Sequence, residues 1–220
     1  GKFLTQRVLP RLSLVQTAIG QDSLAVTGPS MDPLHLPVGL SGLPTTEVEV
    51  WGDRVQALQA GPEARAWFSR FLGIDCQPVF MPESSSRVVD PQNSSQERPI
   101  SFADGFPFLL ISESSLEDLN SRLPEPILMN RFRPNIVVRG CDPYAEDSWK
   151  SIRIGGVLFQ VAKPCARCVT TTVDQAKGTA GKEPLHTLSL YRNRNGKVLF
   201  GQNLTHEGTG MLTVGDQVAL

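Results

Sequence analysis

The 220-residue chain has few cysteines, no excess of charge of either sign and no long apolar run. Its four cysteines are too few for a disulfide scaffold, which favours a reducing compartment. No stretch approaches the roughly 18 uncharged apolar residues that a membrane-spanning helix needs. The 21 Lys and Arg residues almost balance the 22 Asp and Glu residues. The resulting net charge of −1 argues against a general nucleic-acid or anionic-membrane binder.

Several motifs of common enzymes and metal sites are also absent. Gly178 to Lys182 lacks the spacing and the hydroxyl of a phosphate loop, no Gly-x-Gly-x-x-Gly follows a strand, and no Ser or Cys has a recognisable catalytic-triad setting. A structural zinc site needs four closely spaced ligands. Apart from Cys165 and Cys168, the candidate zinc ligands are scattered along the sequence: Cys76, Cys141, His35, His186 and His206.

The composition, with 40% apolar and 20% charged residues, is that of a folded globular protein. Strand patterns outnumber helix patterns, which predicts a β-rich α+β fold with a few short helices and a barrel or strongly curved sheet in the C-terminal half. Helices are expected at Pro62–Leu72, at about Ser115–Arg122 behind a Ser114/Glu117 capping box, and at Pro184–Arg192.

Strands are expected where apolar and polar residues alternate or β-branched residues gather. A polar stretch, 82–99, predicts a surface loop or domain boundary. Gly1–Arg7 reads as a turn followed by a strand, so we expect the natural N-terminus to be missing. The predicted strands are Lys2–Arg7, Leu12–Ala18, Ser23–Thr27, Glu47–Trp51, Cys76–Met81, Asn135–Val138, Ser151–Ile154, Val157–Ala162, Val169–Val173, Lys197–Leu204 and Met211–Leu220.

The strongest local chemical signal is the run from Lys163 to Cys168, which contains Cys165 and Arg167. A thiol beside Arg and Lys has a lowered pKa and can act as a nucleophile, a redox group or a soft metal ligand. A thioredoxin-like motif would open a helix, whereas Val169–Val173 is β-branched. A buried pair without function and a single thiolate ligand to a cofactor metal both remain open.

Two further segments could hold a ligand. Arg131 and Arg133 precede a predicted strand, and their guanidinium groups could bind phosphate or carboxylate, although a solvated Arg pair is the simpler interpretation. Asp104 lies among aromatic residues before Gly105, where an Asp usually serves as a turn residue.

Taken together and in order, these segments resemble the MOSC family of molybdenum-cofactor proteins. The resemblance is greatest to bacterial reductases of N-hydroxylated compounds and to the mitochondrial amidoxime-reducing component. It covers nearly the whole chain, and the order of the motifs makes it specific. The residues that carry it are Phe102–Glu113, Phe132–Val137, Glu146–Trp149, Cys165–Cys168 with Thr171–Val173, and Phe200–Asn203.

The resemblance implies a molybdenum cofactor, a pyranopterin that carries the metal. It implies Cys168 rather than Cys165 as the metal ligand, and Asp104 as a catalytic residue near the metal. Arg133 and Arg167 should bound a positively charged pocket, because a pterin phosphate needs fixed positive charge. The full set of implied cofactor-binding residues is Asp104, Gly105, Phe106, Arg133, Asn135, Ala166, Arg167 and Asn203.

The resemblance also implies a domain organisation and an activity. Residues 1–81 would be the remainder of an N-terminal β-barrel domain and 82–220 the MOSC domain. The family's first β segment, with a Lys and an Arg that grip the cofactor, does not match this chain, so we expect weakened cofactor binding. The activity implied is reduction of amidoximes, hydroxylamines and N-hydroxylated base analogues. A sulfur-carrier or cofactor-handling module and an inactive truncated form are the alternatives.

The same resemblance sets expectations about partners and location. No ferredoxin extension is present, so a separate electron-donor protein would be needed. We expect a monomer with no nucleic-acid partner and no membrane span, cytoplasmic if bacterial. An association with pyridoxal phosphate binding is also expected from the resemblance.

Overall fold

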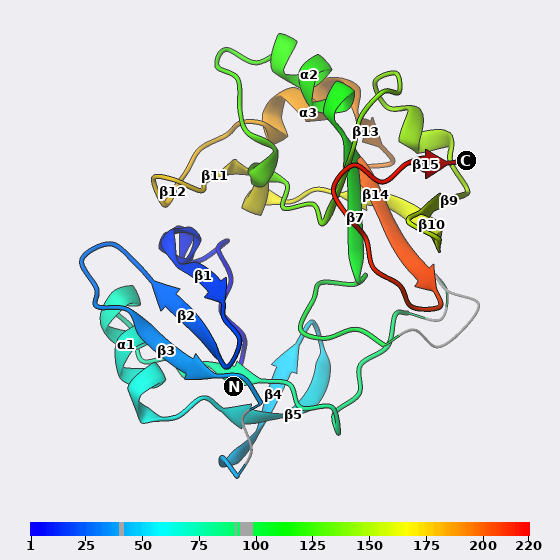
Figure 1. Ribbon diagram of the computed structural model, residues 1–220. Coiled ribbons are helices and arrows are strands. Elements are labelled where there is room, and N and C mark those ends of the chain that lie inside the picture. The colour runs from blue at the N-terminus through cyan, green and yellow to red at the C-terminus, as the bar shows by residue number, and fades with distance from the viewer. Residues whose placement is uncertain (40–41, 91, 93–98) are drawn as a thin grey trace. The chain divides into compact units, whose positions relative to one another are not determined.

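The computed structural model describes residues 1–39, 42–90, 92 and 99–220. These residues form two compact units (Figure 1). The first contains 1–87 together with 173–180, and the second contains 88–172 together with 181–220. A short segment from late in the chain therefore belongs to the N-terminal unit. The domain boundary expected at residues 81 and 82 stays a prediction, and part of the polar 82–99 stretch lies outside the described residues.

The first unit contains two small antiparallel sheets, each of three strands. Residues 20–22 join the first two strands, the first of which is Gln16–Ile19 and not Leu12–Ala18 as predicted. The first sheet has the order β1 (Gln16–Ile19), β2 (Ser23–Thr27), β3 (Leu34–Pro37), and the second has the order β4 (Thr45–Val50), β5 (Asp53–Gln59), β6 (Val79–Phe80). A 3-10 helix, Pro10–Leu14, contacts the late hairpin of β11 (Val173–Asp174) and β12 (Thr179–Ala180).

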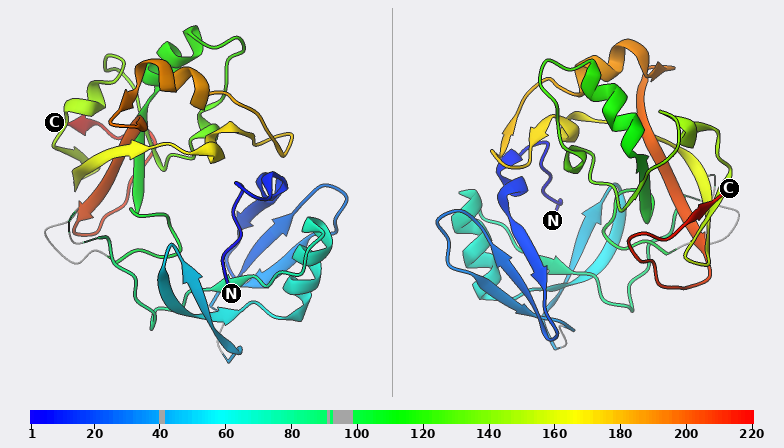
Figure 2. Two further views of the ribbon diagram at one scale, coloured as in Figure 1. Left: turned by 180° about the vertical axis from the view of Figure 1, so that it is seen from behind. Right: turned by 45° about the horizontal axis from the view of Figure 1, so that its top comes forward.

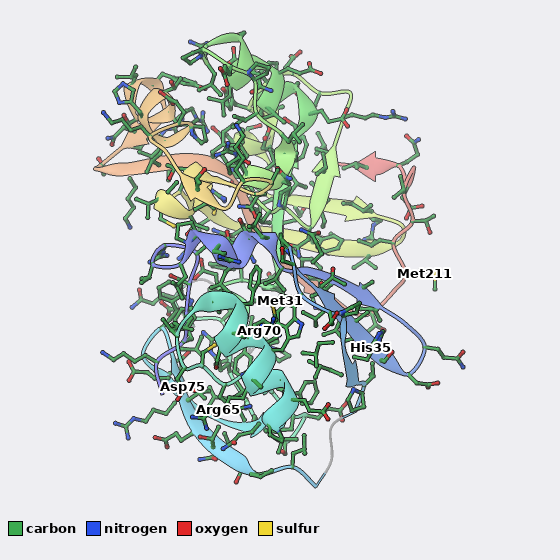
Figure 3. All side chains as sticks on the ribbon, turned by 90° about the vertical axis from the view of Figure 1, so that its left-hand side faces the viewer. Met31, His35, Arg65, Arg70, Asp75 and Met211 are labelled. Carbon is green, nitrogen blue, oxygen red and sulfur yellow. The ribbon has the colours of Figure 1, made fainter. Side chains whose placement is uncertain are left out.

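The helix of this unit, α1, spans Pro62–Leu72, as the sequence predicts. Proline suits its first turn, and Gly73 ends it with a φ of 72°, a conformation that glycine adopts without strain. The buried face of α1 includes Trp67 and Phe71, and the Trp67 indole N–H donates to the Asp32 carbonyl over 2.7 Å. On the exposed face, Arg65 forms a two-pronged ion pair with Asp75; both residues are labelled in Figure 3.

The second unit is built on one curved sheet with the strand order β15-β9-β10-β14-β7-β8 (Figures 1 and 2). Only the β7–β8 pair is parallel, and the remaining pairs, including β13 on β14, are antiparallel. The strands are β7 (Phe108–Ser112), β8 (Ile136–Val138), β9 (Ser151–Ile154), β10 (Val157–Ala166), β13 (Asn193–Arg194), β14 (Lys197–Glu207) and β15 (Val218–Ala219).

Two helices, α2 (Glu113–Ser121) and α3 (Leu185–Tyr191), lie side by side at one end of this sheet (Figures 1 and 2). Successive β7 residues point to opposite faces, so Leu110 enters one core cluster and Ile111 another. The cluster around Ile111 also contains Leu119 of α2, Leu188 of α3 and Phe200 of β14. The predicted β-rich α+β class with a curved sheet and few short helices is confirmed. Within the described residues, no helix has the length and apolarity to cross a membrane.

Two predicted local structures beside the cysteine motif and at α2 are wrong. Val169–Thr172 forms a 3-10 helix rather than a strand, because the Thr171 and Thr172 hydroxyls bond back to the carbonyls of Cys168 and Val169 over 2.9 and 2.8 Å. Helix α2 is capped by Ser112 rather than by Ser114, and the Ser112 hydroxyl accepts from the backbone N–H of Ser115.

Several predicted strands are shorter than expected. Lys2–Arg7 contributes only a bridge between Lys2 and Glu49, Cys76–Met81 shortens to Val79–Phe80, and Met211–Leu220 shortens to Val218–Ala219. The sequence analysis also missed β5, which forms a tight hairpin with β4: the pairing runs from Val50 opposite Asp53 to Thr45 opposite Leu58.

Candidate functional site

The strand register places two predicted cofactor-binding residues, Asn135 and Asn203, in one row across the sheet. Asn135, directly before β8, exchanges two hydrogen bonds with Leu109 of β7: its side-chain oxygen accepts from the Leu109 N–H over 2.9 Å, and its own N–H donates to the Leu109 carbonyl over 3.0 Å. Leu109 faces Asn203 of β14, and Asn203 faces Lys163 of β10. Asn135 and Asn203 are therefore separated by one strand, in a row that ends on Lys163.

The Asp104–Phe106 segment lies beside this row. It directly precedes β7, and the ammonium group of Lys163 lies 4.9 Å from the centroid of the Phe106 ring. Asp104 and Gly105 are exposed, and Phe106 is half-buried. The predicted acid is thus carried on a surface segment whose aromatic residue is held by a cation from β10.

Strand β10 is irregular where it passes these residues. Its register against β14 shifts between Val161 and Lys163 and again between Pro164 and Ala166. Proline cannot donate to the ladder, and an extra residue in one strand re-aims its neighbours, which is common beside binding sites. This irregular part of β10 connects the regularly paired part of the strand to the cysteine motif.

The guanidinium group of Arg167 joins the two basic segments. One Nη donates to the Phe132 carbonyl over 2.8 Å and the other to the Cys165 sulfur over 3.0 Å, while the Arg167 backbone N–H donates to the Val198 carbonyl over 2.7 Å. The guanidinium carbon lies 5.3 Å from the centroid of the buried Phe132 ring. Its Nε is buried and has no hydrogen-bond partner among the described residues.

Cys168 directly precedes the 3-10 helix Val169–Thr172. Its side chain is half-buried, and its Sγ lies 3.4 Å from the Thr170 hydroxyl. Arg131 fixes the end of the same helix by donating from Nη1 to the Thr172 carbonyl over 3.0 Å. All four cysteines are among the described residues, and none is in a disulfide.

The structure therefore brings the Phe132–Arg133 segment together with the cysteine motif, as two segments of one site require. Arg133 itself is exposed and has a φ of 55°, a left-handed conformation that is uncommon for a bulky side chain. Ala166 is exposed at the end of β10. The positively charged pocket between Arg133 and Arg167 stays a prediction, as do the individual site roles.

Sequence reasoning assigned no role to a buried polar set that supports this region. Asp147 accepts from the side chain of Gln202 over 2.8 Å and from Arg192 over 2.7 Å, and Arg192 also donates from Nε to the Leu199 carbonyl over 3.1 Å. These bonds fix β14 directly beside Asn203. The signal was available, because the Glu146–Trp149 run carries part of the family resemblance.

A second polar network joins α2 to α3. The Tyr144 hydroxyl donates to the Asp118 carboxylate over 2.6 Å and lies 2.8 Å from the Tyr191 hydroxyl. Burial raises the pKa of Tyr144 above its ordinary value, and the hydrogen bond from Arg122 lowers the pKa of Asp118. These phenols stay protonated at neutral pH, so the network stabilises the packing of the two helices.

Comparison with known families agrees with this architecture. Residues 1–75 match the MOSC N-terminal beta barrel domain, and residues 97–219 match the MOSC domain. The chain belongs to the MOSC family.

Curated MOSC relatives cover almost the whole chain. It is 36% identical to mitochondrial amidoxime-reducing component 1 from Mus musculus and likewise 36% identical to that from Homo sapiens, over 100% of this chain and 69% of each relative. It is also 35% identical to molybdenum cofactor sulfurase from Oryza sativa subsp. japonica, over 94% of this chain and 28% of that protein. The resemblance stated from the motifs is confirmed.

The chemistry of the candidate site fits an anionic cofactor with a soft metal. Arg167 keeps a buried N–H without a partner among the described residues, and exposed Arg133 lies next to the carbonyl that Arg167 binds. Within the described part of the chain, no group of three or more His, Cys, Asp or Glu side chains could hold a metal by itself. Cys165 and Cys168 supply thiol groups, which soft metals prefer as ligands.

Proposed function

We propose that this protein is a molybdenum-cofactor-dependent oxidoreductase that reduces N-hydroxylated compounds: amidoximes, hydroxylamines and N-hydroxylated base analogues. One observation carries the proposal most directly. In a chain of the MOSC family, Arg167 ties the cysteine motif to the Phe132–Arg133 segment and retains one buried N–H for a ligand. The names of the amidoxime-reducing relatives indicate the substrate class.

The residues near the cysteine motif would hold the metal end and the phosphate of the cofactor. Cys168 would be the thiolate ligand, because it is the second cysteine of the family motif Cys165–Cys168. Arg133 and Arg167 would bind the phosphate, since two guanidinium groups supply forked, permanently charged donors. The exposed backbone at Ala166 would contact the cofactor between them.

The row of sheet residues would hold the rest of the cofactor and the substrate. Asn135 and Asn203 would donate from their amides to the pterin, and Gly105 and Phe106 would flank it. When bound, the cofactor supplies the two electrons that cleave the N–O bond. Asp104 would deliver a proton from its carboxyl group to the leaving oxygen, so that one substrate, two electrons and two protons give the reduced amine or amidine and water.

The partners would be a small N-hydroxylated substrate and a separate protein that donates the electrons. Pyridoxal phosphate binding, which the resemblance also implies, has no support from the contacts of the described residues and stays a prediction.

The test compares two cysteine variants with the parent protein. Cys168→Ser should lose most of its molybdenum and all reduction of benzamidoxime, whereas Cys165→Ser should keep most of both. Molybdenum is measured by elemental analysis, and benzamidine formation is measured with a chemical reductant, so the natural electron donor is not needed. The reverse pattern would show that the ligand is Cys165.

The rice relative supports a second candidate, a sulfur-carrier or cofactor-handling module. Its name is molybdenum cofactor sulfurase, and it matches 94% of this chain. In that case Cys168 would carry a persulfide, and cyanide would release one sulfur per chain while benzamidoxime stays unreduced. Molybdenum content with amidoxime turnover favours the first function, and cyanolysable sulfur without turnover favours the second.

A further inference from the structure

Lys163 is a cation of the candidate site to which the proposed function gives no role. Its side chain is exposed, and it lies on β10 beyond Gln160, the last residue of this strand that pairs with β9. Its ammonium group lies 4.9 Å from the Phe106 ring centroid. None of the ion pairs found among the described residues involves Lys163.

The backbone holds Lys163 at a defined place in the site. It pairs with Asn203 across the β10–β14 ladder, and register shifts flank it on both sides. Pro164 follows it and restricts the residue before it to extended conformations. The cation is therefore fixed at one end of the row of Asn135, Leu109 and Asn203, next to the Asp104–Phe106 segment.

The other cations of this region already have partners or proposed ligands. Arg167 donates to Phe132 and Cys165, Arg131 donates to Thr172, and Arg133 would bind the cofactor phosphate. Among the described residues, the Lys163 ammonium group lies against the ring face of Phe106, and that contact leaves it able to donate to a further anion. An incoming molecule can supply that anion.

We propose that Lys163 determines substrate specificity by favouring N-hydroxylated compounds that carry an anionic group, such as a carboxylate, over neutral or cationic ones. This inference rests on the proposed function, because it assumes that N–O reduction takes place beside Phe106 and Asn203. An exposed ion pair changes an equilibrium by a factor of up to about five, so a preference of this size is expected.

The experiment uses three benzamidoximes with the same reacting group. They differ only in the para substituent, which is carboxylate, carboxamide or aminomethyl. The parent protein should show its highest kcat/KM for the carboxylate. Lys163→Gln should lower the ratio of carboxylate to carboxamide kcat/KM about fivefold, and Lys163→Arg should restore most of it. Lys197→Gln, which removes an exposed cation at the far end of β14, should leave the ratio unchanged.

Two further measurements separate this role from others. The dissociation constant of 4-carboxybenzamidine, the product, should rise about fivefold in Lys163→Gln by calorimetric titration, with little change for 4-carbamoylbenzamidine. The carboxylate preference should also weaken from low to high salt, because screening acts on exposed charges. Molybdenum is measured in every variant.

Each outcome has one meaning. If the parent protein reduces none of the three compounds, the proposed function fails. If it reduces them and Lys163→Gln leaves the ratio unchanged, the role of Lys163 fails while the proposed function stands. If Lys163→Gln loses its molybdenum, Lys163 binds the cofactor and the specificity role is overturned.

Discussion

The buried carboxylate of Glu146 gives the most direct test of how this fold is held together. The residue is 1% exposed. It accepts from the Ser112 backbone N–H over 3.1 Å, from the Ser112 hydroxyl over 3.0 Å and from the Ser115 hydroxyl over 2.8 Å. The Ser112 hydroxyl in turn caps α2, so one carboxylate connects the end of β7 to the start of a helix.

Removing this carboxylate leaves the Ser112 N–H buried without an acceptor, which costs about 1–3 kcal/mol. The two hydroxyls lie 2.6 Å apart and can still bond to each other, but each loses a charge-assisted bond. We therefore expect Glu146→Ala to lower the free energy of unfolding by about 3 kcal/mol. Glu146→Gln keeps a carbonyl oxygen for the Ser112 N–H and should cost about 1 kcal/mol or less.

The assay is urea denaturation followed by circular dichroism, with the free energy extrapolated to water. Glu117→Ala is the matched control, because Glu117 is an exposed acid on α2 that the sequence analysis placed in a capping box. It should change stability by less than about 0.5 kcal/mol. A loss below about 1 kcal/mol for Glu146→Ala, or equal losses for Glu146→Ala and Glu117→Ala, would refute the reasoning.

Two further predictions concern stability. Gly201 has a φ of 78°, and an added Cβ would lie 2.6 Å from Cγ1 of Ile111. Gly201→Ala should therefore lower the free energy of unfolding, measured by urea denaturation, by about 2–4 kcal/mol. Gly105 has open space around it, so Gly105→Ala should cost under about 1 kcal/mol, and equal losses for the two variants would contradict this prediction. Arg122 holds the pKa of Asp118 below its ordinary value, so Asp118 contributes stability above its unfolded pKa, and this contribution disappears as pH falls through the folded pKa. The stability difference between the parent protein and Asp118→Asn should therefore be constant near neutral pH and shrink below about pH 4, and a difference that grows on acidification would exclude this cause.

The sequence alone determined the elements whose signals are local. Helix α1 carries apolar residues at helical spacing, a proline in its first turn and a glycine at its end, and its bounds were predicted as Pro62–Leu72. The hairpin of β9 and β10 follows from two β-prone runs around Gly155 and Gly156. The family could also be inferred from the sequence alone, because five short motifs in a fixed order can be recognised without knowing how the chain folds.

Tertiary structure decided the features that depend on distant partners. Val169–Thr172 is β-branched, yet its hydroxyls bond to nearby carbonyls and Arg131 binds its last carbonyl, so it forms a helix turn rather than a strand. Ser112 caps α2 in place of Ser114 because buried Glu146, 34 residues away, orients its hydroxyl.

The candidate site divides in the same way. The sequence supplied Asp104, Asn135, Cys168 and Asn203 as candidates, because residue type and motif identify what chemistry a side chain can perform. Only the strand register places Lys163 opposite Asn203 and against Phe106, since a register shift of one residue would send each side chain to the other face of the sheet. Local chemistry is encoded residue by residue, whereas the neighbours of a charge are set by the packing of the whole chain.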